Sequence, residues 1–320
     1  MTINDETPRQ IRPLDPRRDL MAVADLIEEC FATGMDADGK EYLRQLRRTA
    51  HEVQIMRLSA QSMENLSMPL SGYVWEENGR IVGNLSLIPL RKEHQRVYLI
   101  ANVAVTPEYR QQGIAKELTL CALDFVRQRG APAAWLQVRE DNPVAKHLYV
   151  ELGFHQRASR TTWQSLPAVP EVRETEVRVV SRQRSHWEQQ SIWLEETYPP
   201  QVRWNLPFAP RDFKPGLFKE LMDFLNGFNY RHWSALKEDT LIGTASWTPA
   251  RGYADNLWLG VDQRFEQEAV SALLIRARRQ LFSRRPLWVN YPAGRAVEAF
   301  AAAGFTQHIT LDWMEHRLNR

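Results

Sequence analysis

The chain carries the same series of sequence signals twice, and this internal repetition limits the folds that it can adopt. The hairpin end GRIVGNLS at 79–86 returns as DTLIGTAS at 239–246. The segment NPVAKHLYVELGF at 142–154 returns as YPAGRAVEAFAAAGF at 291–305, and both end in a Gly-Phe pair. A chain of 320 residues is also longer than one hydrophobic core usually organises. We therefore expect two copies of one fold that differ by loop deletions and share one order of elements.

Each copy has the pattern of a mixed α/β domain. Apolar residues at helical spacing alternate with short apolar runs, and Asn78-Gly79 predicts a tight hairpin because both residues tolerate positive φ. The elements expected in the first copy are strands at 11–13, 71–76, 80–88, 98–105 and 134–139 and helices at 20–31, 40–48, 114–127 and 143–152. The expected fold class is thus α/β, with a mixed central sheet flanked by helices in each of two tandem domains.

A short segment between the copies interrupts this pattern. Residues 165–174 contain Pro167 and Pro170 among small and charged residues, which is typical of a linker. We therefore predict a first domain at 9–164, a linker at 165–174 and a second domain at 175–320.

The composition excludes several classes of function. Lys+Arg 41 nearly balance Asp+Glu 39, so no charge field indicates a nucleic-acid partner. No run approaches the roughly 18 apolar residues of a membrane span, and the opening residues lack the pattern of a signal peptide. Cys30 and Cys121 stand far apart and without a histidine cluster. We expect a cytoplasmic protein with no membrane partner, no disulfide framework and no metal.

The segment from Val103 to Ala115 has the features of a phosphate-binding loop between a buried strand and a helix. Gly113 and the small Ala115 would let phosphate oxygens approach the main chain, where N–H groups and the positive end of the helix attract an anion. Arg110 would add an ionic contact. Taken alone, such a segment is equally typical of an ordinary strand-to-helix turn.

A second informative segment follows about thirty residues later. Asp141 or Asn142 can cap a helix whose first turn suits Pro143, and Gly153 would end that helix. Tyr149 lies on the apolar face of the same helix, where an aromatic side chain is usually part of the core.

Together the two segments resemble the GCN5-related N-acetyltransferase (GNAT) family. RQQGIA at 110–115 matches the family pattern Gln/Arg-x-x-Gly-x-Gly/Ala, and 142–154 matches its Asn-x-x-Ala-x-x-x-Tyr-x-x-x-Gly-Phe helix. The order and spacing of the two motifs agree as well, and the order of elements extends the resemblance over about residues 9–160.

The resemblance implies an acetyl-CoA site in the first domain and the roles of its residues. Backbone groups near Val103 and Val105 would hold the pantetheine arm and the thioester carbonyl, with Asn142 beside the pantetheine. Tyr149 would be the general acid that protonates the departing thiolate. The CoA pyrophosphate would be held by the loop residues Arg110, Gln111, Gln112, Gly113, Ile114 and Ala115.

The general base is left open by the sequence. Some family members carry a glutamate on the strand before the loop, whereas the strand at 98–105 has no carboxylate here. A water relay remains possible, as does a carboxylate from elsewhere, such as Glu28, Glu29 or Glu76.

The second copy keeps the outline but not the site residues. Glu266 and Glu268 stand where the phosphate loop would be and would repel phosphate, and Phe300 stands in the place of Tyr149. We expect this degenerate copy to bind no cofactor, and to build the acceptor pocket or to replace a dimer partner. The second role favours a monomer, with a homodimer as the alternative.

The expected function is that of an acetyl-CoA-dependent N-acetyltransferase, a transferase that acts by direct attack of an amine on the thioester. The acceptor would be an amine of a small molecule or peptide. The alternative is a non-catalytic acyl-CoA-binding sensor, against which Tyr149 beside an intact loop favours catalysis.

Overall fold

A computed structural model of the chain describes residues 10–35, 37–55, 70–92, 95–168, 176–216, 230–250, 252–281 and 285–318. The chain divides into two compact units. The first comprises Met1–Val138, Asn142–Gln156 and Met314–Arg320, and the second comprises Arg139–Asp141 and Arg157–Trp313. Most of the predicted linker lies outside the described residues.

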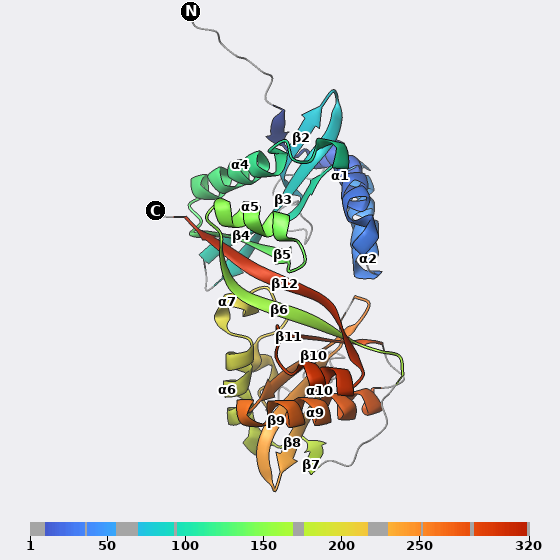
Figure 1. The fold of residues 1–320 in the computed structure, drawn as a ribbon, viewed down its shortest axis with the longest axis vertical. Helices are drawn as coiled ribbons and strands as arrows, with labels where there is room; N and C mark the ends of the chain where they lie inside the picture. Colours follow the sequence, from blue (N-terminus) through green and yellow to red (C-terminus); the bar gives the residue numbers. More distant parts are fainter. Residues whose placement is uncertain are drawn as a thin grey trace, which may run out of the picture. The chain divides into compact units, whose positions relative to one another are not determined.

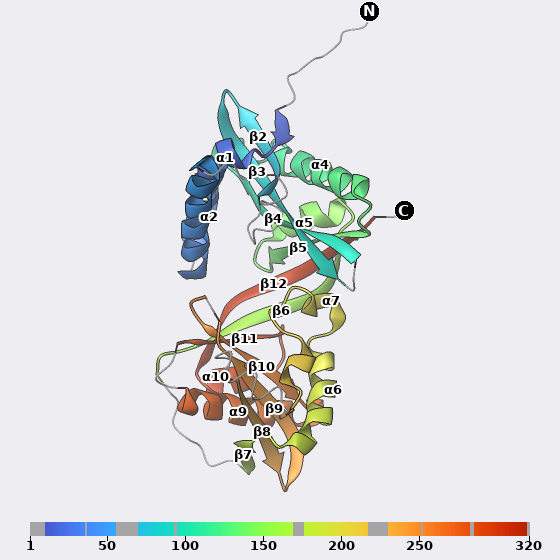
Figure 2. The ribbon, with the colours of Figure 1, turned by 180° about the vertical axis from the view of Figure 1, so that it is seen from behind.

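The first unit is a mixed sheet with helices on both faces. Its strands are β1 (Ile11–Pro13), β2 (Ser71–Glu77), β3 (Arg80–Lys92), β4 (Gln95–Val105) and β5 (Ala133–Arg139), paired in the order β1-β2-β3-β4-β5. Only the pair β4–β5 is parallel. The helices α1 (Pro16–Phe31) and α2 (Ala37–Ile55) lie on one side of this sheet, and α4 (Ile114–Gln128) and α5 (Pro143–Glu151) lie on the other, as Figures 1 and 2 show.

The second unit repeats this series. Its strands are β7 (Val177–Ser181), β8 (Arg231–Lys237), β9 (Thr240–Thr248), β10 (Asp255–Val261) and β11 (Leu287–Pro292), in the order β7-β8-β9-β10-β11. The last pair is again the parallel one. Its helices are α6 (Trp187–Thr197), α7 (Pro200–Arg203), α9 (Glu266–Gln280) and α10 (Val297–Ala302). The predicted fold, a mixed α/β sheet with flanking helices present twice, is confirmed.

The final strand of each repeat is divided between the two units. β6 (His155–Ser165) follows α5 along the chain, but from Arg157 onward it belongs to the second unit, where it pairs antiparallel with β11. β12 (Phe305–Arg317) follows α10, and from Met314 onward it belongs to the first unit. There Leu318 N donates to Pro132 O at 2.9 Å. The units therefore differ from the predicted domains, which assigned each final strand to its own repeat.

Helix α1 begins earlier than its apolar pattern predicts. The expected start was residue 20, whereas the helix starts at Pro16, directly after Asp15. The Asp15 side chain accepts a hydrogen bond from Arg17 N at 3.0 Å, and proline suits the first helical turn. The polar cap and the proline, which precede the first apolar residue, thus set the boundary.

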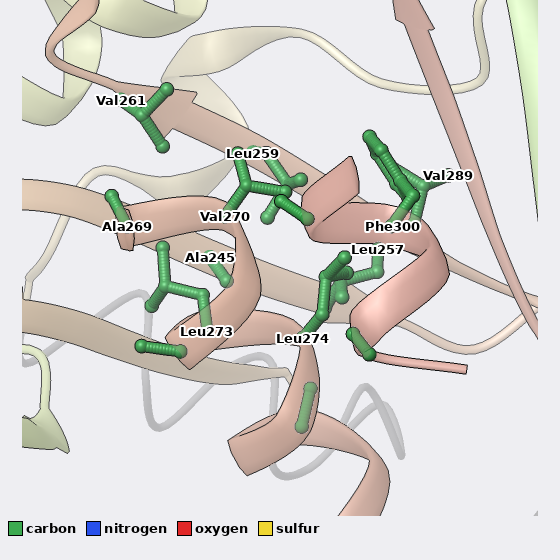
Figure 3. Packing of buried hydrophobic residues seen from close by; sticks show 14 of the residues in the cluster. Ala245, Leu257, Leu259, Val261, Ala269, Val270, Leu273, Leu274, Val289 and Phe300 are labelled. Carbon is green, nitrogen blue, oxygen red and sulfur yellow. The ribbon is translucent and has the colours of Figure 1, made fainter. Parts of the chain in front are cut away.

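Each unit has a hydrophobic core of its own between its sheet and its helices. In the second unit, Val270, Leu273 and Leu274 of α9 are fully buried against Leu257 and Leu259 of β10, as Figure 3 shows. Their spacing of three and four residues places them on one face of the helix. In the first unit, α4 uses the same spacing to cover β3 and β4.

We predict that Met314→Ala destabilises the first unit. Met314 is only 2% exposed and lies in the first unit's core, so its loss should cost about 2–5 kcal/mol. Hydrogen–deuterium exchange read by mass spectrometry should show faster exchange in β5 and α4 and unchanged exchange in β9. Gln307→Ala, an exposed position on the same strand, is the control. Faster exchange confined to the second unit would contradict this assignment of the strand end.

Candidate cofactor and active site

The parallel strands β4 and β5 separate partway along β4. Their pairing joins Tyr98 to Ala134 and ends where Ile100 meets Leu136. β4 continues to Val105, so residues 101–105 have lost β5 as a partner strand, and we call them the splayed segment. Main-chain groups at such a separation are available to a ligand that enters between the strands.

A β-bulge lies within the splayed segment. Asn102 has φ 51°, in the left-handed region, and the register between β3 and β4 shifts between Asn84 and Ser86. Asn84 Nδ2 donates to Asn102 O at 2.9 Å, which gives this bulged carbonyl a partner. Asn102 Nδ2 in turn donates to Tyr42 Oη of α2 at 2.6 Å. The bulge is thus held by side chains from a neighbouring strand and from a helix.

The loop from Arg110 to Gly113 opens toward an anion-binding position at the head of α4. Gln111 and Gly113 have φ 64° and 81°, and backbone of this kind can turn successive N–H groups toward one side. Gly113 is the N-cap of α4 and no side chain caps the helix. A Cβ placed on Gly113 would meet nothing within 4 Å, so the space beside the Gly113 Cα is open. The 15-residue α4 adds the positive end of its dipole.

Arg110 connects this loop to the splayed segment. Its Nε donates to Val105 O at 3.1 Å, and Cys30 Sγ donates to the same oxygen at 3.3 Å. Burial raises the pKa of Cys30, so the thiol is neutral at physiological pH. The Val105 carbonyl is therefore already paired within the unit, while the exposed Arg110 side chain remains next to the loop.

Tyr149 belongs to the hydrophobic core beneath the loop. It is 6% exposed, and its ring lies edge-on to Phe154 with the centroids 5.8 Å apart. Ile114 is in the same core, and Val103 and Val105 pack partly against it. Burial raises the pKa of Tyr149 to about 12, and its hydroxyl makes no hydrogen bond within the described part of the chain. The side chain is therefore a neutral phenol that keeps its proton at physiological pH.

Asn142, and not Asp141, caps α5. Its Oδ1 accepts a hydrogen bond from Ala145 N at 3.1 Å. Asp141 instead accepts two hydrogen bonds from Arg139, at 2.8 and 2.7 Å, and these lower its pKa. The acceptor atom of Asn142 is thus committed to the helix.

The three carboxylates considered as general bases are all paired with arginines. Glu28 contacts Arg47 at 2.6 Å and Glu29 contacts Arg80 at 3.7 Å. Glu76 contacts Arg12 at 2.6 Å and Arg18 at 2.8 Å. The hydrogen bond from Arg12 lowers the pKa of Glu76, which makes it a weaker base. In the described residues, no group of three or more histidine, cysteine or acidic side chains is placed to hold a metal ion.

Sequence reasoning missed Tyr42, Asn84 and Asn102. One signal was present, because Asn102 interrupts the apolar run from Leu99 to Val105 and asparagine tolerates positive φ. Tyr42 carries no comparable signal, since only the packing of α2 brings it to the bulge.

None of the helices in the described ranges is long and apolar enough to cross a membrane.

The corresponding positions of the second unit are filled by its own side chains. The pairing of β10 and β11 ends at Asn256 and Trp288, and Leu259 N beyond that point donates to Tyr198 Oη at 3.2 Å. Glu266, the first residue of α9, accepts a hydrogen bond from Tyr291 Oη and contacts Arg295, both at 2.6 Å. The first turn of α9 thus carries a carboxylate that is paired with Tyr291 and Arg295, and no side chain caps the helix.

A splayed parallel strand pair followed by an uncapped helix N-terminus is the arrangement of acetyltransferases of the GNAT fold, and sequence comparison agrees. The sequence model of the Acetyltransferase (GNAT) family matches residues 39–154. N-alpha-acetyltransferase 30 of Schizosaccharomyces pombe is 36% identical over 108 residues, covering 28% of this chain and 71% of that protein. The chain belongs to the GNAT family.

Other comparisons match different shares of the chain. A ribosomal protein bS18-alanine N-acetyltransferase of Haemophilus ducreyi is 36% identical over 66 residues, 21% of this chain. The chain spans 46% of that relative's length. A GCN5-related N-acetyltransferase from Sphaerobacter thermophilus shares the fold with a TM-score of 0.58 at 15% identity, covering 98% of this chain and 97% of that one. A tandem GNAT protein from the clavulanic acid biosynthesis pathway has a TM-score of 0.50 at 17% identity, covering 97% and 98%.

We predict that Asn142→Ala destabilises the protein by about 1 kcal/mol, because the first turn of α5 loses its cap. Asn142→Ser should retain most of the stability, since serine is also a good N-cap. Urea unfolding would compare the two variants, and an equal loss in both would show that the cap contributes little.

Proposed function

We propose that this protein is an N-acetyltransferase that moves an acetyl group from acetyl-CoA to an amine of a small molecule or peptide. The observation that carries the proposal is the open N-terminus of α4 at Gly113, directly connected through Arg110 to the splayed segment. Two relatives are named for acetylating a protein alanine or an N-alpha group, which supports an amine acceptor.

In this proposal, acetyl-CoA lies with its phosphates at the head of α4 and its thioester at the bulge. Main-chain N–H groups of residues 112–115 bind the pyrophosphate, and Arg110 and Gln111 flank it. The pantetheine arm follows the splayed segment at Val103 and Val105, and the amide of Asn142 faces it. An elongated ligand with charge at one end fits an apolar strand gap that ends at an anion-binding helix terminus.

The chemistry is a direct transfer. The amine nitrogen attacks the thioester carbon, so that a C–N bond forms and the C–S bond breaks. Negative charge develops on the carbonyl oxygen, and a main-chain N–H held by the bulge stabilises it. Nitrogen loses one proton and sulfur gains one.

Tyr149 is the proposed proton donor to sulfur. Its pKa of about 12 keeps it protonated, but a free thiol has a pKa of about 8.5, so full transfer to a relaxed thiolate is unfavourable. Donation must therefore occur while the C–S bond is breaking and the sulfur is more basic than a free thiolate. Solvent then restores the phenol if the proton has moved.

We also propose that the second unit binds no cofactor and contributes to the acceptor pocket or replaces a dimer partner. Tyr198 Oη already accepts the hydrogen bond of Leu259 N, and Glu266 places a negative charge in the first turn of α9, where it would repel a phosphate. One equivalent of acetyl-CoA per chain is therefore expected.

Substitution of Gly113 by glutamate tests the site directly. The new side chain places bulk and negative charge in the open space before α4, so calorimetric titration should show one equivalent of acetyl-CoA bound by the wild type and none by Gly113→Glu. Gly130→Glu is a matched control at the other end of the same helix. Gly130 also has positive φ, 65°, and an added Cβ there also meets nothing within 4 Å.

The control separates backbone strain from disruption of the acetyl-CoA site, because both variants place a glutamate at a position with positive φ. Equal loss of binding in both would indicate a general folding defect. Failure of the wild type to bind, or binding indifferent to Gly113, would reject the proposed function.

Tyr149→Phe should lower turnover by about 10²-fold while acetyl-CoA affinity stays unchanged, as expected for the loss of a general acid. Release of the CoA thiol, with an amine found by screening, measures the rate. Because the pKa of Tyr149 is raised to about 12, ionisation of its phenol should cause no loss of rate between pH 8 and about pH 10. Unchanged turnover in the variant would remove Tyr149 from the mechanism.

A further inference from the structure

Tyr42 joins helix α2 to the bulge of β4. Its ring is half-buried and packs against the core that contains Leu20, Leu43 and Leu46. Its hydroxyl oxygen accepts the 2.6 Å hydrogen bond from Asn102 Nδ2. One end of the side chain is therefore fixed by packing, and the other end holds the bulged residue.

The bulge needs such support because its conformation is unfavourable for most residues. Asn102 has φ 51°, in a region that most non-glycine residues occupy only where their surroundings hold them there. Ser86 Oγ accepts a second hydrogen bond from Asn102 Nδ2 at 3.3 Å. Asn84 holds the carbonyl of Asn102 from β3. The side chain and the main chain of Asn102 are thus fixed separately.

The direction of the next peptide groups depends on this residue. Val103 follows Asn102 in the splayed segment, where β5 no longer constrains the backbone. A misplacement of about 1 Å at a reacting group can reduce a rate about 10²-fold, so the bulge must be held closely to aim an N–H at a carbonyl.

We propose that Tyr42 is a positioning residue of the acetyl site. By holding Asn102, it fixes the bulge so that the Val103 N–H meets the thioester carbonyl of acetyl-CoA. This inference rests on the proposed function, and it adds a residue of α2 that neither sequence motif contains.

Comparison of acetyl-CoA with CoA isolates this role, because only acetyl-CoA carries the thioester carbonyl. Calorimetry should show that the wild type binds acetyl-CoA more tightly than CoA. In Tyr42→Phe the ratio of these two affinities should fall about threefold to tenfold, the range for one hydrogen bond. Affinity for CoA should change less than about twofold, since the phosphate contacts at α4 are untouched. A merely structural defect would weaken both ligands together.

Two further variants test the route through Asn102. Glycine adopts positive φ without strain, so Asn102→Gly keeps the bulge and removes its link to Tyr42. It should reproduce the effect of Tyr42→Phe, and the double variant should lose no more preference than either single variant. Tyr98→Phe is the control, because Tyr98 is a buried tyrosine on the paired part of β4.

The outcomes separate this inference from the proposed function. If the wild type binds neither ligand, the proposed function fails and this inference fails with it. If the wild type binds both ligands equally, or if Tyr42→Phe leaves the preference intact, the positioning role is overturned while CoA binding stands. The proposal would also be overturned if the double variant lost the product of the two single-variant losses of acetyl-CoA preference. Tyr42 would then act on the ligand without Asn102.

Discussion

The separation of β4 from β5 after Ile100 is the constraint on which the rest of the first unit's site depends. Main-chain N–H and C=O groups need partners, and a strand that leaves its neighbour must find them elsewhere. In the first unit, Asn84 and Arg110 supply two of these partners, at the carbonyls of Asn102 and Val105. The splayed segment is followed along the chain by the N-terminus of α4, which no side chain caps. Under the proposed function, this order suits an elongated anionic ligand.

The second unit meets the same constraint in a different way. There a buried tyrosine, Tyr198, accepts the hydrogen bond of Leu259 N, and Glu266 supplies a negative charge at the head of α9. A phenol oxygen thus pairs with the main chain of β10, and a carboxylate lies in the first turn of α9. Two units with one strand order thus differ in the side chains that stand at these corresponding positions, and on this difference rests the proposal that only the first unit binds a cofactor.

Features that depend on neighbouring residues could be predicted from the sequence. The Asn78-Gly79 turn has both residues at positive φ, and Asn142 caps α5 with Pro143 in its first turn. The division of the final strands between the two units could not be predicted, because the residues of β12 indicate a strand but not the unit to which each of its ends belongs. The role of Tyr42 was hidden for a related reason, since 60 residues separate it from Asn102 and tertiary packing alone brings them together.

The pairing of the acidic residues bears on the acceptor. Glu28, Glu29 and Glu76 are each held by an arginine, so none of these three is a free carboxylate that could take a proton from an ammonium group. An acceptor of which a larger fraction is neutral has less need of such a base. A lysine side chain has a pKa of about 10.4 and an α-amino group about 7.7–8.0, so at pH 7 the neutral fraction of the α-amine is about 10²-fold larger. Under the proposed function, this difference favours an α-amino group over a lysine side chain as the acceptor.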